Sequence, residues 1–351
     1  MQMEELKMVS TEIEMESFNK LLKQYPIDSA QAIISEGKGG ANNTTKYIES
    51  MGHKYVMRIY ETHKDIERVL VEHEILEELN KDNRLTFQVP QLIRASNGQT
   101  ALRLPDGSGR IVAISKYLEG INPSFNNDKS IFSFGQTTGL LMNALNNIKI
   151  KRSYAYKPYY EIEHTHPQCP PDYIAEWCNH PPQPFQDLSV QLQWIAEQIY
   201  CFQSQVSWLR QLPHQLIHGD LNASNVLMDN DRIINAILDF EFATNDLRVM
   251  EVAVCLSELM VGEMNESAIW DKLNIYIKGL RTTIHLNELE LEALPILVQL
   301  RRLDVFIHFL GRYHDGVDEA DVLRRQIVNA VSRPDWIKAG GPKLIALCNH
   351  S

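Results

Sequence analysis

The chain has 351 residues, of which 44% are hydrophobic and 23% are charged, so it is long enough for two domains and a sizeable core. Its formal net charge of -11 and its lack of a basic run disfavour nucleic-acid binding, because phosphate backbones need clustered Lys and Arg. The absence of an apolar run of about 18 residues predicts that the chain has no membrane span.

The five cysteines are odd in number and none forms a C-x-x-C pair. A disulfide framework is not expected in so long a chain, so the composition favours a reducing cytoplasm. The first 17 residues are acidic and amphipathic and lack the apolar segment of a signal peptide, which agrees with a cytoplasmic location.

The N-terminal elements predict a small antiparallel sheet. A helix is expected at about residues 12–25, followed by strands at 32–34, 44–48 and 55–60. A turn-rich stretch, 36–43, separates the first two strands, and Met-Gly-His at 51–53 joins the next pair.

The next predicted element is a helix over residues 65–80, in which Val69, Leu76 and Leu79 form an apolar stripe. Glu72 falls in the middle of this stripe, whereas Glu74 points to the opposite side. Because an unpaired buried carboxylate is costly, Glu72 is expected to have a cationic partner.

Further strands are predicted at 87–93, 100–104 and 111–114, after which the chain becomes mostly helical. Helices are expected at 131–148, 188–212 and from about 250 onward, with an irregular segment at 151–186. This order predicts an α+β fold with two lobes. We place the domain division after residue 117, with a β-rich lobe at 1–117 and a helical lobe at 118–351.

The strongest chemical signal lies in residues 216–241. An apolar strand leads into His-Gly-Asp at 218–220, Asn225 follows five residues after Asp220, and an apolar hairpin ends at Asp239. Phosphoryl transfer needs charge neutralisation and alignment of the acceptor more than covalent chemistry. Hard oxygen ligands hold magnesium, so we predict that Asn225 and Asp239 bind Mg²⁺ and that Asp220 orients a substrate hydroxyl.

This pattern resembles the aminoglycoside phosphotransferase and choline kinase group, whose loop carries His-Gly-Asp where protein kinases carry His-Arg-Asp. Within that group, residues 239–246, 251–254 and 300–310 are similar to the homoserine kinase-like branch, which also includes amicoumacin-type antibiotic kinases. The resemblance implies a protein-kinase-like fold with two lobes, ATP and Mg²⁺ as cofactors, and the hydroxyl of a small molecule as acceptor.

The resemblance also implies a nucleotide-binding set within or next to the first lobe: Gly39, Gly40, Asn43, Arg58, Glu72, Lys116 and Leu118. In this interpretation the glycine-rich loop covers the ATP phosphates, and the last two residues bind adenine through their backbone groups. Arg58 stands where the family has a phosphate-binding Lys, with Glu72 as its partner. Arg is larger and binds as a fork, so this exchange leaves open an impaired enzyme.

The late helix around residues 300–310 has two interpretations. Its polar residues either form a solvated face or contact the acceptor, with Asp304 or His308 facing the cleft; they are Arg301, Arg302, Asp304, His308, Arg312 and Tyr313. No residue in this part of the chain is assigned a role by the pattern.

Three functions remain open at this point. The first is a small-molecule kinase, either an antibiotic-inactivating kinase for an amino-hydroxy compound or a homoserine kinase-like metabolic enzyme. The second is a binding or scaffold protein that has lost turnover. The third, a protein kinase, is disfavoured because the His-Arg-Asp, Asp-Phe-Gly and Ala-Pro-Glu motifs are missing. The sequence does not specify the acceptor, the nucleotide preference or the oligomeric state.

Overall fold

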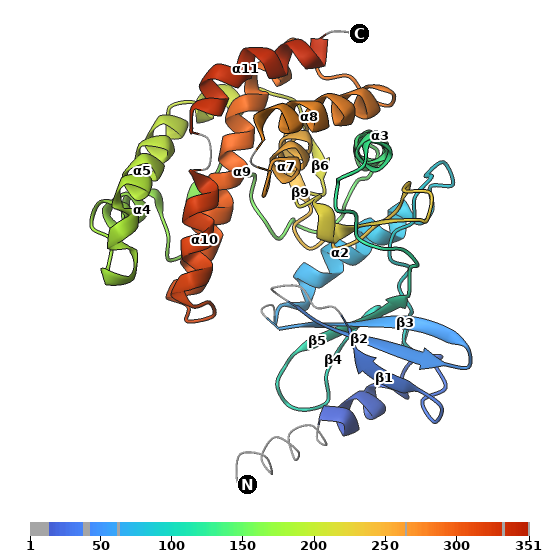
Figure 1. Ribbon diagram of the computed structural model, residues 1–351. Coiled ribbons are helices and arrows are strands. Elements are labelled where there is room, and N and C mark those ends of the chain that lie inside the picture. The colour runs from blue at the N-terminus through green and yellow to red at the C-terminus, as the bar shows by residue number, and fades with distance from the viewer. Residues whose placement is uncertain (1–13, 38–42, 62–63, 264, 332–333, 350–351) are drawn as a thin grey trace. The chain divides into compact units, whose positions relative to one another are not determined.

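The computed structural model describes residues 14–37, 43–61, 64–263, 265–331 and 334–349 (Figure 1). The chain divides into two compact units. The first unit comprises Met1–Gly120, Lys149–Ser153 and Ala236–Glu241, and the remaining residues make up the second. Two late segments therefore belong with the N-terminal residues, and the division after residue 117 stays a prediction.

The first unit is built on a five-stranded antiparallel sheet in the order β1-β2-β3-β5-β4 (Figure 1). Its strands are β1 (Ile33–Glu36), β2 (Asn43–Ser50), β3 (His53–Tyr60), β4 (Ala101–Arg103) and β5 (Ile111–Lys116). Strands β2 and β3 are joined by a two-residue turn in which Met51 and Gly52 both have positive φ, 52° and 76°. Such a turn matches the twist of the flanking strands and fixes their register.

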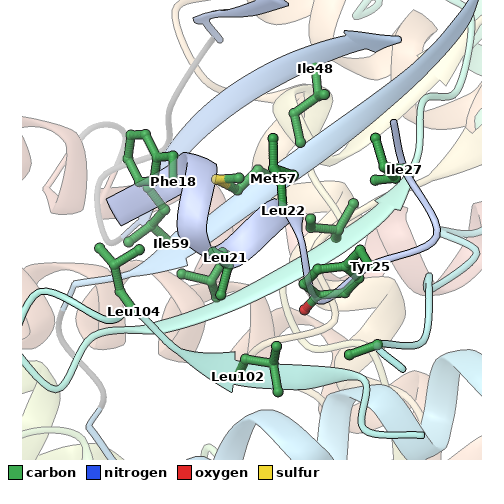
Figure 2. Packing of buried hydrophobic residues seen from close by; sticks show 13 residues of the cluster. Phe18, Leu21, Leu22, Tyr25, Ile27, Ile48, Met57, Ile59, Leu102 and Leu104 are labelled. Atoms are coloured by element: carbon green, nitrogen blue, oxygen red, sulfur yellow. The ribbon is translucent and has the colours of Figure 1, made fainter. Parts of the chain in front are cut away.

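One face of this sheet carries the main core of the first unit. The helix at 14–22 contributes Phe18, Leu21 and Leu22, which pack against Ile48 and Met57 of the sheet (Figure 2). All five side chains are fully buried. Because side chains alternate along a strand, the neighbours of Met57 on β3 project to the opposite face.

Helix α2 (Ile66–Leu79) packs on that opposite face. Its N-cap, Asp65, accepts a hydrogen bond from the backbone N–H of Glu67. Val69 of α2 lies in a buried cluster with Tyr60, Ala101 and other sheet residues. Residues of β3 that alternate with Met57 therefore face α2.

The second unit is mainly helical (Figure 1). Its helices are α3 (Asp128–Leu145), α4 (Pro171–Asn179), α5 (Ser189–Gln203), α6 (Val206–Leu209), α7 (Met250–Leu259), α8 (Glu266–Arg281), α9 (Glu288–His314), α10 (Ala320–Ala330) and α11 (Pro334–Asn349). Short strands pair as β6 (His214–Ile217) with β9 (Thr244–Leu247) and as β7 (Val226–Met228) with β8 (Ile234–Ile237), whose last two residues belong to the first unit. None of the helices in the described ranges has the length and hydropathy needed to span a bilayer.

The structure differs from the sequence prediction in three places. Residues 87–93 form no strand and make only isolated bridges through Gln88 and Leu92, where Pro90 has no N–H to donate. The helix predicted at 188–212 is divided into α5 and α6. The irregular segment 151–186 contains α4, which starts at Pro171, a residue suited to a helix N-terminus.

Helices α3 and α8 approach each other closely because each has a glycine at the contact. A Cβ atom added to Gly135 would lie 2.0 Å from the carbonyl oxygen of Tyr276, and one added to Gly279 would lie 2.0 Å from that of Phe132. Both obstacles are backbone atoms, so a side chain at either position forces the helices apart.

We predict that Gly135→Ala destabilises the protein by about 1–3 kcal/mol, because overpacking at a backbone contact outweighs the gain of about 1 kcal/mol that Ala brings to an open helix. Urea unfolding measures the change. The control is Lys129→Ala on the exposed surface of α3, which is expected to shift stability by less than about 0.5 kcal/mol. A stabilised Gly135→Ala variant would contradict the close contact.

Candidate active site

The first unit contains a cluster of three carboxylates around one guanidinium group. Arg58 Nη1 donates to Glu72 Oε1 at 3.2 Å, and Arg58 Nη2 donates to Asp239 Oδ1 at 2.6 Å and to Glu241 Oε2 at 2.8 Å. Arg58 reaches these groups because it alternates with Met57 on β3 and so faces α2. The ion pair predicted between Arg58 and Glu72 is therefore present, and Glu241 is an additional partner.

The burial of Glu72 makes this cluster electrostatically demanding. Its side chain is 6% exposed, and its carboxylate accepts a second hydrogen bond, from the Tyr60 hydroxyl at 2.9 Å. Burial raises the pKa of Glu72 to about 7, and Arg58 opposes that rise. Burial alone would lower the pKa of Arg58. The negative charges of Asp239 and Glu72 have the larger effect and hold that pKa well above its ordinary value. One fixed positive charge thus faces three acidic groups.

Asp239 has an unusual backbone conformation. Its φ is 62°, in the left-handed region that Asp adopts more readily than most residues with a side chain. The conformation turns the chain just after β8 and presents a side chain that is 32% exposed. Strained backbone of this kind gathers at functional sites, where the surrounding contacts hold it in place.

The end of the glycine-rich turn reaches the same cluster. Asn43, the first residue of β2, donates from Nδ2 to Glu241 Oε2 at 2.6 Å. Gly39 and Gly40 lie outside the described residues. Of the predicted phosphate loop, the structure therefore places Asn43 beside the carboxylates.

The predicted adenine-binding residues lie at the end of β5. The N–H of Lys116 donates to Gln91 O at 2.9 Å, and that of Tyr117 donates to Lys54 O at 3.1 Å. Leu118 follows directly and is partly buried. Since the Lys116 N–H is already used, a ligand at Lys116 would contact its carbonyl oxygen.

In the second unit, the loop that carries the His-Gly-Asp motif is fixed through its backbone. Gly219 has a φ of 79°, and an added Cβ would lie 3.2 Å from the carbonyl oxygen of Phe242. The buried Glu251 of α7 accepts the N–H of His218 at 2.5 Å and that of Gly219 at 3.4 Å through Oε2. The N–H of Asp220 donates to His218 Nδ1 at 3.2 Å, so His218 has a structural contact in the loop.

Asp220 and Asn225 lie together, as their positions on one short loop predict. Asn225 Nδ2 donates to the Asp220 carbonyl oxygen at 2.8 Å and to Asp220 Oδ2 at 2.9 Å. Asn122 stabilises the same loop by donating to the carbonyl oxygens of Ala223, Ser224 and Val226 at 3.0–3.2 Å. Asn225 thus uses its nitrogen for Asp220, and its Oδ1 accepts a hydrogen bond from Ser224 Oγ at 3.4 Å.

The donor chemistry of these residues fits a magnesium ion. Asp239 supplies a carboxylate oxygen and Asn225 a neutral amide oxygen, and Mg²⁺ in nucleotide sites uses one or two such side chains together with phosphates and water. Among the residues that the structure describes, no group of three His, Cys, Asp or Glu side chains could hold a metal by itself. Asp239 belongs to the first unit and Asn225 to the second.

Arg301 of α9 contacts Asp220. Its Nη2 donates to Asp220 Oδ1, and its Nη1 donates to the Tyr159 hydroxyl at 2.7 Å. Tyr159 in turn donates from its hydroxyl to the Gly219 carbonyl oxygen at 2.5 Å. Of the two interpretations of this helix, a solvated face is wrong for Arg301, whose side chain is only 16% exposed.

Two more carboxylates lie near Arg301. Asp304 Oδ1 accepts a hydrogen bond from Thr165 Oγ1 at 3.0 Å, and its Oδ2 lies 3.8 Å from Arg301 Nη1. Burial raises the pKa of Asp304 to about 6, against the opposing effect of Arg301. Burial also raises the pKa of Glu258, which accepts the N–H of Ala223 at 3.1 Å. The surroundings of Asp220 are therefore acidic overall.

The anchoring of the loop by Glu251 and the hydrogen bonds of Arg301 to Asp220 and Tyr159 were not predicted from the sequence. For Glu251 a signal exists, because a carboxylate inside the apolar run 250–256 raises the same question as Glu72 does in α2. For the contact between Tyr159 and Arg301 there is none, because it depends on how segments 142 residues apart pack.

We predict that Glu251→Ala lowers the free energy of unfolding by about 2–4 kcal/mol, because it leaves the buried N–H groups of His218 and Gly219 without their acceptor. Guanidinium chloride unfolding measures this loss. Glu197→Ala, at an exposed position on α5, is the control and should change stability by less than about 0.5 kcal/mol. Equal stability of the two variants would show that Glu251 does not hold the loop.

Comparison with known proteins relates this chain to phosphotransferases. The profile of the "phosphotransferase enzyme family" (APH) matches residues 33–273. A homoserine kinase of Parvibaculum lavamentivorans is 25% identical over 333 residues, which are 90% of this chain and 94% of that protein.

Two solved structures share the fold. An amicoumacin kinase in complex with AMP-PNP and Ca²⁺ superposes with a TM-score of 0.67 at 15% identity and covers 93% of both chains. A microcompartment-associated aminopropanol kinase gives a TM-score of 0.66 at 17% identity, over 93% of this chain and 98% of the other. At these identities the likeness concerns the fold, which is the predicted α+β, protein-kinase-like fold.

Proposed function

Because the chain belongs to the phosphotransferase enzyme family (APH), we propose that it is an ATP- and Mg²⁺-dependent kinase that phosphorylates a hydroxyl group of a small molecule. The main support is the loop in which Asp220 and Asn225 are hydrogen-bonded to each other on a backbone anchored by Glu251. A short loop with one carboxylate and one amide side chain suits alignment of a hydroxyl and ligation of a metal. We expect the enzyme to act in the cytoplasm.

The reacting groups have separate tasks in this proposal. Asp220 accepts a hydrogen bond from the acceptor hydroxyl and orients it toward the γ-phosphate. Asn225 and Asp239 are the magnesium ligands, and the metal, when bound with the nucleotide, neutralises phosphate charge. The surplus of carboxylates around Arg58 supports cation binding at Asp239.

The nucleotide is proposed to contact residues of the first unit. Arg58 binds phosphate oxygens with its forked guanidinium, and Glu72 holds it in position. The loop containing Gly39, Gly40 and Asn43 covers the phosphates. The Lys116 carbonyl and the Leu118 N–H are the backbone groups proposed to bind the adenine edge. The AMP-PNP and Ca²⁺ in the amicoumacin kinase support a nucleotide with a divalent ion.

For the acceptor we propose an amino-hydroxy compound that carries a protonated amine, with an antibiotic as one candidate. The support is the acidic surroundings of Asp220, where the carboxyl groups of Asp304 and Glu258 outnumber the one guanidinium group, that of Arg301. The aminopropanol kinase, by its name, acts on an amino alcohol, and the amicoumacin kinase acts on amicoumacin. A fold that binds without turnover is the alternative that Arg58 leaves open, and phosphotransfer to any acceptor would exclude it.

Homoserine is the second candidate acceptor. Its support is the relative of that name, which matches 90% of this chain. Homoserine carries a carboxylate as well as an amine, so an acidic surrounding would favour it less than an amino alcohol without a carboxylate. A coupled ADP-release screen with 1-amino-2-propanol, choline, homoserine, aminoglycosides and amicoumacin distinguishes the two.

We predict that Asp220→Asn and Asp239→Asn each lower kcat by about 10³-fold or more and leave the unfolding transition within a few degrees of the parent protein. Asp220→Asn loses the acceptor of the hydroxyl hydrogen bond, whereas Asp239→Asn loses a charged metal ligand. A coupled assay and thermal unfolding measure the two effects. Near-normal turnover of Asp220→Asn would refute the proposed reaction.

We also predict that kcat/KM for a cationic acceptor falls as the pH decreases through about 6, the pKa of Asp304. Protonation removes a negative charge that attracts the amine. In Asp304→Asn, kcat/KM should be lower at pH 7.5 and this part of the pH profile should flatten. A neutral alcohol that serves as a slow acceptor is the control, and an identical pH dependence for it would argue against binding of the amine by Asp304.

A further inference from the structure

We propose that Arg301 is a positioning residue, which holds the carboxylate of Asp220 in the orientation that phosphoryl transfer requires. This inference rests on the proposed role of Asp220. It assigns to α9, which is far from the catalytic loop in sequence, a specific part in the reaction.

The first argument is the way in which Asp220 is held from two sides. Arg301 Nη2 contacts Oδ1, and Asn225 Nδ2 contacts Oδ2 at 2.9 Å. With each oxygen bound to a different element, rotation of the carboxylate breaks at least one hydrogen bond. Each carboxylate oxygen has a further lone pair, so Asp220 can accept the acceptor hydroxyl while both contacts persist.

The second argument is that Arg301 is itself fixed to the same loop. Its Nη1 donates to the Tyr159 hydroxyl at 2.7 Å, and that hydroxyl donates to the carbonyl oxygen of Gly219, the residue before Asp220. The backbone N–H of Tyr159 is bound to Asp246 Oδ2 at 2.6 Å. Arg301 therefore spans the side chain of Asp220 and, through Tyr159, the adjacent backbone.

The third argument concerns residue type. Two nitrogens of one planar guanidinium make these two contacts, and the ammonium group of Lys has no such fork. The Arg301 side chain is 16% exposed and that of Asp220 is 18% exposed, so solvent screens their interaction only in part.

The test compares Arg301→Ala with Arg301→Lys. Misplacement of a reacting group by about 1 Å can cost about 10²-fold in rate, so we expect Arg301→Ala to lose about 10²-fold in kcat while KM for ATP stays within about threefold. Arg301→Lys keeps the charge and should lose about tenfold. Tyr159→Phe, which removes the link to Gly219, should lose about three- to tenfold.

Chemical rescue separates positioning from a general structural role. Guanidinium ion at non-denaturing millimolar concentration should restore the kcat of Arg301→Ala at least fivefold, and the ammonium ion should restore less. The control is Arg324→Ala, which removes an exposed ion pair with Asp187 and should neither lose activity nor respond to guanidinium.

These experiments distinguish a wrong positioning role for Arg301 from a wrong proposed function. If Arg301→Lys retains kcat within twofold of the parent, or if guanidinium fails to restore a folded Arg301→Ala protein, the positioning role is wrong even when Asp220→Asn is inactive. If Asp220→Asn keeps normal turnover, the proposed function itself is wrong. Should Arg301→Ala not fold, the kcat values of Arg301→Lys and Tyr159→Phe decide.

Discussion

The cost of burying charge governs the chemistry of both units. Arg58 and Glu72 lie in a region where an unpaired charge would be costly, and their ion pair, with Asp239 and Glu241, compensates for the lost solvation. In the second unit, Arg301 has the same relation to Asp220 and Asp304. In each unit a single guanidinium organises several carboxylates, which leaves a negative excess suited to binding cations.

The sheet and the main helices follow from periodicity, because each of these elements buries one face within its own unit. The strands β2, β3 and β5 and helices α2 and α3 lie where alternation and helical spacing predict them. The strand predicted at 87–93 is absent from the structure. Its apolar run has the pattern of a strand, but the segment, which contains Pro90, makes only isolated bridges. Helix α4 was missed because its short length gives too few turns for a periodic signal.

The candidate site was predictable where chemistry and local spacing coincide. Asp220 and Asn225 are five residues apart on one loop, so their contact needed no knowledge of tertiary structure. Glu72 and Arg58 were paired by a burial argument combined with a family resemblance, and the structure contains that pair. The contact of Arg301 with Asp220 could not be predicted, because nothing in residues 300–310 indicates which side of the 27-residue helix α9 meets the His-Gly-Asp loop.

The division of the chain has a practical consequence for fragment expression. Residues 236–241 are part of the first unit, although more than a hundred residues of the second unit precede them in the sequence. A fragment that stops at Gly120 would therefore lack Asp239 and Glu241, and Arg58 would keep only Glu72 of its three acidic partners. No single cut in the polypeptide separates the two units intact, so a fragment with the complete first unit would require residues 149–153 and 236–241 to be grafted or co-expressed.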